Sequence, residues 1–78
     1  MEDRIRTLDM LEEGECARVQ MLCMSGAIRR RLQDIGLIAG TTVRCLLKSP
    51  SGDPAAYCIR GAVIALRKND AKGIQVHE

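Results

Sequence analysis

The sequence has almost no aromatic side chains: its 78 residues include no Trp, no Phe and a single Tyr. Apolar residues nevertheless make up 46% of the chain, which is enough for a folded core and argues against intrinsic disorder. The core must therefore be aliphatic, with Cys and Met filling irregular gaps. A chain of this length supports one small core, so we expect a single domain over residues 1–78.

Long hydrophobic runs and a strong net charge are also missing. No apolar stretch approaches the roughly 20 residues that span a bilayer, and the charged residues 1–4 lead into no signal-peptide core. We therefore predict a cytoplasmic protein with no direct membrane insertion. The net charge of +2 is too small for the strongly basic surface of most nucleic-acid binders, so no nucleic-acid partner is expected.

The four cysteines lack the spacing of a metal site. Without a secretory leader we expect free thiols, and intervals of 7, 22 and 13 residues contain no C-x2-C pair. Cys45 and Cys58 are the weak metal-ligand candidates, because they flank the central turn symmetrically. The apolar alternation instead places Cys45 inward and Cys58 outward. The sole histidine, His77, stands near the chain end and adds little.

Turn residues divide the chain at the short intervals typical of a small β-barrel. Residues 15–22 alternate in character, which predicts a half-buried strand with Ala17, Val19 and Met21 inward. Further strands are predicted at 42–48, 55–60, 62–67 and 74–76. Their expected inward residues are Val43, Cys45, Leu47, Tyr57, Ile59, Ile64, Leu66, Ile74 and Val76.

One segment has a helical period. Its apolar residues repeat at i, i+4 and i+7: Ile28, Leu32 and Ile35. With Ser25 as N-cap and Gly36 just past the end, this stripe predicts a helix over residues 26–35. Asn69 and Asp70 can cap a single further turn. The pattern predicts an all-β fold, an SH3-like barrel of five to six strands with one short α-helix after the first strand.

Three blocks of sequence resemble the FeoA family, small cytoplasmic proteins of bacterial and archaeal ferrous iron uptake. Residues 30–43 (RRLQDIGLIAGTTV) match its helix, glycine turn and next strand, 50–54 its hairpin turn, and 65–71 its penultimate strand and cap. The likeness covers about residues 8–76. It implies an SH3-like barrel that regulates FeoB, a membrane transporter with a cytosolic GTPase domain, and so a location at the inner membrane through that partner.

The resemblance leaves two other functions open. A similar barrel forms the C-terminal domain of iron-dependent repressors of the diphtheria-toxin-repressor type, so a stand-alone metal-responsive regulatory domain is the alternative. Such a domain would take a transition metal, Fe²⁺ or Zn²⁺, although no cofactor is firmly predicted. This chain lacks the helix-turn-helix with which those repressors read DNA. The third hypothesis is a weakly homo-oligomeric interaction module.

Partner-binding residues are expected on the helix and on the hairpin loop. Arg29, Arg30 and Arg31 form the one basic run, but consecutive helical residues fan over about 200° and cannot all serve one site. Ser51 and Asp53 lie in a projecting loop of the kind that often carries recognition. A soft apolar patch is the third candidate: Met21, Cys23 and Met24. Catalysis is not expected, because no nucleophile stands beside a base.

Overall fold

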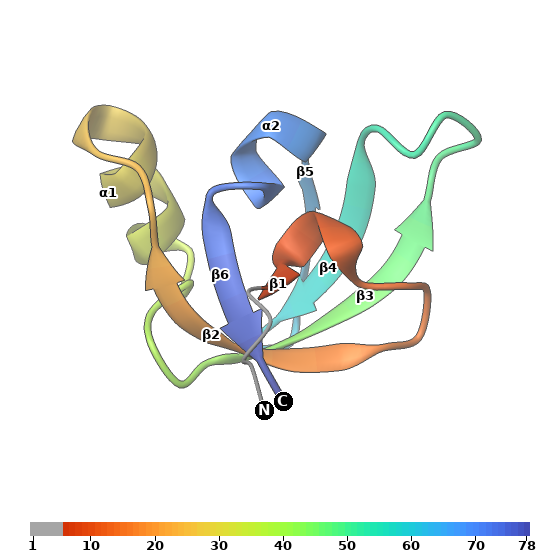
Figure 1. Ribbon diagram of the computed structural model, residues 1–78, viewed down its shortest axis with the longest axis horizontal. Coiled ribbons are helices and arrows are strands. Elements are labelled where there is room, and N and C mark those ends of the chain that lie inside the picture. Colours follow the sequence, from red (N-terminus) through yellow and green to blue (C-terminus); the bar gives the residue numbers. More distant parts are fainter. Residues whose placement is uncertain (1–5) are drawn as a thin grey trace, which may run out of the picture.

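The computed structural model describes residues 6–78, so the charged residues 1–4 lie outside the described residues. Within that range six strands form one antiparallel sheet in the order β1-β6-β2-β3-β4-β5. The strands are β1 Arg6–Thr7, β2 Cys16–Leu22, β3 Thr42–Lys48, β4 Ala55–Ile59, β5 Ala62–Leu66 and β6 Ile74–His77. The sheet curls around its inner face (Figure 1), which confirms the predicted SH3-like barrel.

Short helices occupy the connections of this barrel. The 3-10 turn η1 (Leu8–Met10) follows β1, the helix α1 (Gly26–Asp34) follows β2, and the single turn α2 (Lys68–Ala71) joins β5 to β6. Both α-helices lie toward the same end of the barrel (Figure 1). The predicted helix is confirmed, but it follows the second strand, since two-residue β1 is too short to show an alternating pattern. No helix among residues 6–78 has the length and apolar character needed to cross a membrane.

The core is aliphatic around one aromatic ring. Tyr57 is 1% exposed, and its hydroxyl lies 3.5 Å from the Leu8 carbonyl oxygen. Side chains from every strand except β1 close around it, together with η1 and the segment after α1. The fully buried aliphatic residues are Leu8, Leu11, Val19, Leu37, Val43, Ile59 and Ile74. A single core of this kind agrees with the alternation seen in the sequence.

Two residues expected in the core lie on the surface instead. Met21 is 50% exposed and Leu47 is 61% exposed. In both strands the pairing register shifts just before the residue, between Val19 and Met21 and between Cys45 and Leu47. A bulge adds one residue and reverses which side chains face inward. Both predictions are wrong for this reason, and after the first bulge Leu22 is buried in place of Met21.

Helix α1 ends just before Gly36, as predicted from the position of this glycine. The Gly36 amide donates to the Gln33 carbonyl at 3.0 Å and the Leu37 amide to the Leu32 carbonyl at 3.0 Å, the paired bonds of a Schellman motif. Gly36 has a φ of +108°, which favours glycine. Ser25 occupies the N-cap position, but its side chain makes no capping hydrogen bond.

Replacing Gly36 by alanine is expected to destabilise the barrel more than the same change at Gly40. Both residues have positive φ, which costs about 1–2 kcal/mol for alanine. A methyl at Gly36 would also lie 2.7 Å from Cδ of Arg60, whereas nothing lies within 4 Å at Gly40. We expect about 1 kcal/mol of additional loss at Gly36, measured by urea unfolding. Equal losses at the two positions would show that the Arg60 contact has no effect.

Candidate functional site

A groove separates α1 from the edge strand β5. Its volume is about 490 Å³, within the range of pockets that accept a ligand or a few side chains. The apolar stripe of α1 forms one wall: Ile28, Leu32 and Ile35. The other wall is formed by four consecutive residues, 64–67, and Asp70 of α2 lies at the end. Residues 64–66 belong to β5, and Arg67 follows it at the start of α2. Successive side chains of a strand point to opposite faces, so three consecutive lining residues show that the edge of β5 borders the groove.

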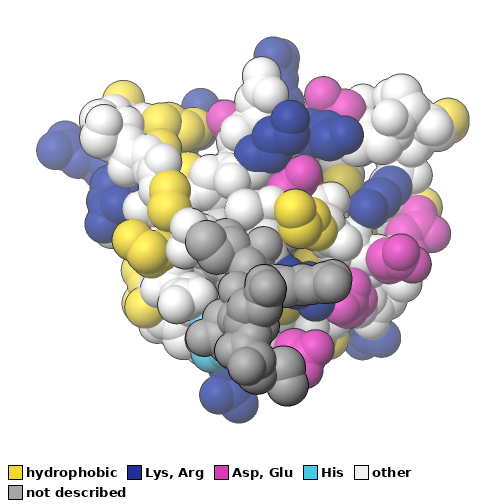
Figure 2. Space-filling view, viewed as in Figure 1, with side chains coloured by type: hydrophobic (Ala, Val, Ile, Leu, Met, Phe, Trp, Pro, Cys, Tyr) yellow, Lys and Arg dark blue, Asp and Glu magenta, His cyan; other side chains and the backbone are white. Residues whose placement is uncertain are grey.

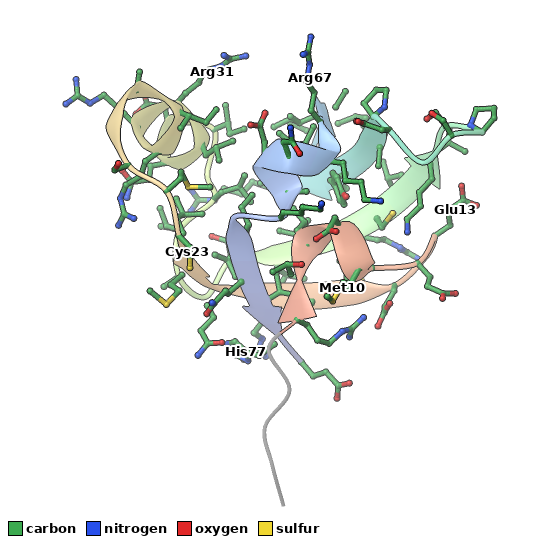
Figure 3. All side chains as sticks on the ribbon, turned by 45° about the horizontal axis from the view of Figure 1, so that its top comes forward. Met10, Glu13, Cys23, Arg31, Arg67 and His77 are labelled. Carbon is green, nitrogen blue, oxygen red and sulfur yellow. The ribbon has the colours of Figure 1, made fainter. Side chains whose placement is uncertain are left out.

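The rim of the groove is positively charged. Arg31 of α1 and Arg67 at the end of β5 both line it, and both project from the same end of the molecule (Figure 3). Within residues 6–78 the one side-chain ion pair joins Arg6 and Glu15, so neither groove arginine contacts a carboxylate at ion-pair distance. The two guanidinium groups are therefore free to meet an external anion.

Charges of both signs lie on the surface around this groove. Lys and Arg side chains lie along α1 and over α2, acidic side chains also lie beside α2, and a further group of Asp and Glu lies near the loop between η1 and β2 (Figure 2). That loop carries Glu12, Glu13 and Glu15, and hydrogen bonds from Arg6 lower the pKa of Glu15. Two arginines and one carboxylate, Asp70, line the groove, so a partner facing it meets a net positive surface, although the net charge of the chain is small.

The three arginines of the basic run have different surroundings. Arg29 is half-buried, and its guanidinium donates to the Leu22 carbonyl at 2.8 Å and the Met24 carbonyl at 3.4 Å. This side chain ties α1 to the end of β2. Arg30 and Arg31 are exposed, and Arg31 alone of the three lines the groove. Consecutive residues of a helix point in different directions. Arg29 therefore contacts the backbone, whereas Arg31 faces the groove.

The hairpin loop is tied to α2. A carboxylate oxygen of Asp53 accepts from the Lys68 backbone amide at 2.9 Å, at the first residue of that helix. The Ser51 hydroxyl donates to the Asp53 carbonyl at 3.0 Å. The cap of α2 therefore comes from Asp53 rather than from the predicted Asn69 or Asp70. Partner binding by Ser51 and Asp53 stays a prediction.

Replacing Asp53 by alanine is expected to reduce the free energy of unfolding by about 1 kcal/mol. The change removes the side-chain acceptor for a helix N-terminal amide, a loss of the size seen when helix caps are deleted. Thermal unfolding monitored by circular dichroism measures it. Ser51→Ala is the control in the same exposed loop, and its effect should stay within about 0.5 kcal/mol. An unchanged melting temperature for Asp53→Ala would contradict the capping role.

The cysteines do not converge on a metal-binding arrangement. Cys45 is fully buried and pairs with Tyr57, whereas Cys58 pairs with Arg44 and is partly exposed on the outer face. Burial raises the pKa of the Cys45 thiol, which disfavours the thiolate that a metal requires. Among residues 6–78 no three His, Cys, Asp or Glu side chains are grouped to hold a metal ion. The side chains that the structure describes are therefore not arranged to hold a resident metal ion.

The proposed apolar patch before α1 is only partly exposed. Met21 and Cys23 lie on the surface, but Met24 packs against the core. Figure 3 places Cys23 well away from Arg31 and Arg67, so this patch is separate from the groove. Sequence reasoning missed Arg67 as a site residue. Nothing in the sequence around Arg67 marks it as a site residue, because only the fold places the end of β5 beside α1.

The geometry defines a small SH3-like barrel with a positively rimmed groove beside an open sheet edge. Residues 6–78 match the family model described as the FeoA domain. The chain therefore belongs to the FeoA family, which is associated with ferrous iron transport. A comparison with curated protein sequences found no match.

Solved structures agree with this family. The FeoA protein of Chlorobium tepidum is 38% identical with a TM-score of 0.87, over 92% of this chain and 69% of that chain. A FeoA-like protein of Clostridium acetobutylicum is 32% identical with a TM-score of 0.86, over 97% and 88%. Stenotrophomonas maltophilia FeoA, described as an SH3 domain protein complexed with zinc, is 32% identical with a TM-score of 0.82, over 91% and 88%.

The barrel also occurs within larger proteins. A manganese-dependent transcriptional repressor has a TM-score of 0.79 to this chain, which spans 41% of that protein. The identity is 22%, so the likeness concerns the fold alone. ScaR, solved with bound Cd²⁺, is also 22% identical with a TM-score of 0.79, and this chain spans 35% of that chain. The same barrel fold therefore occurs inside longer chains.

Proposed function

We propose that this chain is a non-enzymatic cytoplasmic accessory protein of ferrous iron uptake that docks on the FeoB transporter. It acts as one domain over residues 1–78, reaches the inner membrane through its partner, and has ferrous iron as the cargo of the system rather than as a cofactor. The observation that carries the proposal is the FeoA family match over residues 6–78.

The groove between α1 and β5 is the proposed docking surface. Its walls offer apolar side chains, including Ile28 and Ile64, and its rim offers Arg31 and Arg67 without carboxylate partners at ion-pair distance. Arginine beside an apolar pocket is a frequent composition of strong binding sites between proteins. An acidic surface on the transporter would complement the rim and accelerate association.

Retention of the chain by purified full-length FeoB tests the function. We expect the immobilised transporter to retain the chain, and a strain without the gene to take up less ferrous iron. Uptake should return when the wild-type gene is restored. Normal uptake in the deletion strain, together with no retention by full-length FeoB or by its cytosolic domain, would refute the proposal.

The metal-responsive regulatory alternative rests on the repressor-like barrel, and the cysteine geometry gives it no support. Calorimetric titration of the reduced protein with Fe²⁺ and with Zn²⁺ discriminates between the two functions. Tight stoichiometric binding that is lost in Cys45→Ser or Cys58→Ser would favour the regulator. We expect no such binding from an accessory protein that only docks.

A further inference from the structure

Strand β5 leaves a regular row of backbone groups unpaired. It joins β4 through a two-residue turn, Arg60 and Gly61, whose φ angles of +53° and +84° are those of a type I′ hairpin. In such a hairpin the flanking residues form a hydrogen-bonded pair, so hydrogen-bonded and non-hydrogen-bonded pairs alternate from Ala62 onward. The amides and carbonyls of Val63 and Ala65 therefore point away from β4.

Nothing among residues 6–78 uses these outward groups. Strand β5 is last in the strand order, and the hydrogen bonds found outside the strand ladders reach neither Val63 nor Ala65. Two amide donors and two carbonyl acceptors thus form an open edge.

The usual protections of an edge strand are missing from β5. Its sequence, AVIAL, contains no charge and no proline, and its pairing with β4 contains no bulge. Natural sheets normally blunt such an edge with one of these features. The opposite edge shows the contrast, since the described part of β1, Arg6–Thr7, includes the charged Arg6. The chain therefore protects one edge and leaves the other able to pair.

The open edge borders the groove, so an added strand would have neighbours on two sides. On one side it would pair with β5, and on the other its inward side chains would contact Ile28 and Leu32 of α1. Side chains facing outward would pass the rim near Arg31 and Arg67. The chemistry that fits is an extended segment that alternates apolar and acidic residues.

We propose that the transporter contributes such a segment as a seventh strand, paired to β5 through Val63 and Ala65. This inference rests on the proposed function and specifies how the docking occurs. Charge favours the transporter over a second copy of this chain, because an acidic segment complements Arg31 and Arg67, whereas β5 of a second copy (AVIAL) has no acidic side chain to meet them.

Ala65→Pro tests the strand addition directly. Proline removes the outward amide of Ala65 but leaves the bonds between β4 and β5, and edge strands tolerate it at such positions. We expect binding to full-length FeoB to weaken about tenfold or more. Ala62→Val is the control, because Ala62 is an exposed residue of β5 that pairs with Ile59 and does not line the groove. It keeps every outward amide and should bind within about twofold of wild type. Amide spectra of both variants verify the fold.

Hydrogen exchange of the wild-type chain provides a second readout that needs no variant. In the complex with full-length FeoB the amides of Val63 and Ala65 should exchange at least about tenfold more slowly than in the free chain. This result would support strand addition even if Ala65→Pro did not fold.

The outcomes separate the two proposals. If wild-type chain binds FeoB but Val63 and Ala65 exchange unchanged and Ala65→Pro binds normally, strand addition is wrong while the docking function stands. If wild-type chain does not bind FeoB, both proposals fail. If the two amides become protected in the free chain as its concentration rises, with a doubled mass in light scattering, the occupant is a second copy and the assignment to the transporter is wrong.

Discussion

Reversing the charge of both groove arginines, in Arg31→Glu with Arg67→Glu, is expected to weaken binding to full-length FeoB at least about 100-fold, or about 2.7 kcal/mol. The two side chains line opposite walls of the groove and have no carboxylate partner at ion-pair distance within residues 6–78. Glutamate would repel an acidic partner segment at both positions. Biolayer interferometry with immobilised transporter measures the change in affinity.

A matched variant separates this site effect from a general charge effect. Arg18 and Arg44 are exposed on the outer face of β2 and β3, and their double reversal changes the net charge by the same amount. We expect it to bind within about threefold of wild type at physiological salt, where distant charges are screened. Equal losses in the two double variants would contradict docking at the groove.

Replacing Tyr57 by alanine is expected to cost about 3–5 kcal/mol of the free energy of unfolding. Tyr57 is the one aromatic ring of the core and is 1% exposed. A 78-residue domain has only about 4–12 kcal/mol of stability, so this single cavity removes much of it. Calorimetry should show the melting temperature lowered by more than about 12 °C. A fall of under about 3 °C would show that the core closes around the cavity.

Tyr57→Phe removes only the hydroxyl of Tyr57, and it is expected to change how the free energy of unfolding depends on pH. Burial raises the pKa of Tyr57 to about 12, from a usual value near 10. The folded state therefore holds the proton more tightly than the unfolded state. The contribution of this pKa shift to the free energy of unfolding is fully present below pH 10. It is lost as the pH rises toward 12, by up to about 2.7 kcal/mol.

Phenylalanine cannot ionise, so Tyr57→Phe should lack this fall and gain stability relative to wild type above pH 10. Cys45 is present in both proteins, and its charge adds to burial in raising the pKa of Tyr57, so the difference between the two curves includes this coupling. Urea unfolding of the two proteins at several alkaline pH values measures the difference. Parallel curves for wild type and Tyr57→Phe would contradict the pKa shift.

The regular elements of the barrel could be predicted from the sequence. Alternation predicts β3 over residues 42–48 as observed, and the apolar stripe with its terminal glycine predicts α1 to within one residue. These features are local, since period and turn chemistry act within a few neighbouring residues. The inward position of Cys45 also follows from alternation, because it precedes the bulge in β3.

The bulges and the groove could not be predicted in the same way. A bulge depends on the pairing of one strand with its neighbour, so Met21 and Leu47 were expected inward although they are exposed. The groove joins α1 to residues 64–67, which are some thirty positions later in the chain, and only the curled sheet brings them together. The family resemblance links the chain to ferrous iron transport. The proposed docking face follows instead from the groove in the folded structure.

The most direct test of docking at the groove is an amide spectrum of the ¹⁵N-labelled chain during titration with full-length FeoB in detergent micelles. Docking at the groove predicts that signals of Ile28, Arg31 and Arg67 lose intensity first, while those of Arg18 and Arg44 persist longest. Early loss at Arg18 and Arg44 with an unaffected groove would contradict it and would place the contact on the outer face of the barrel.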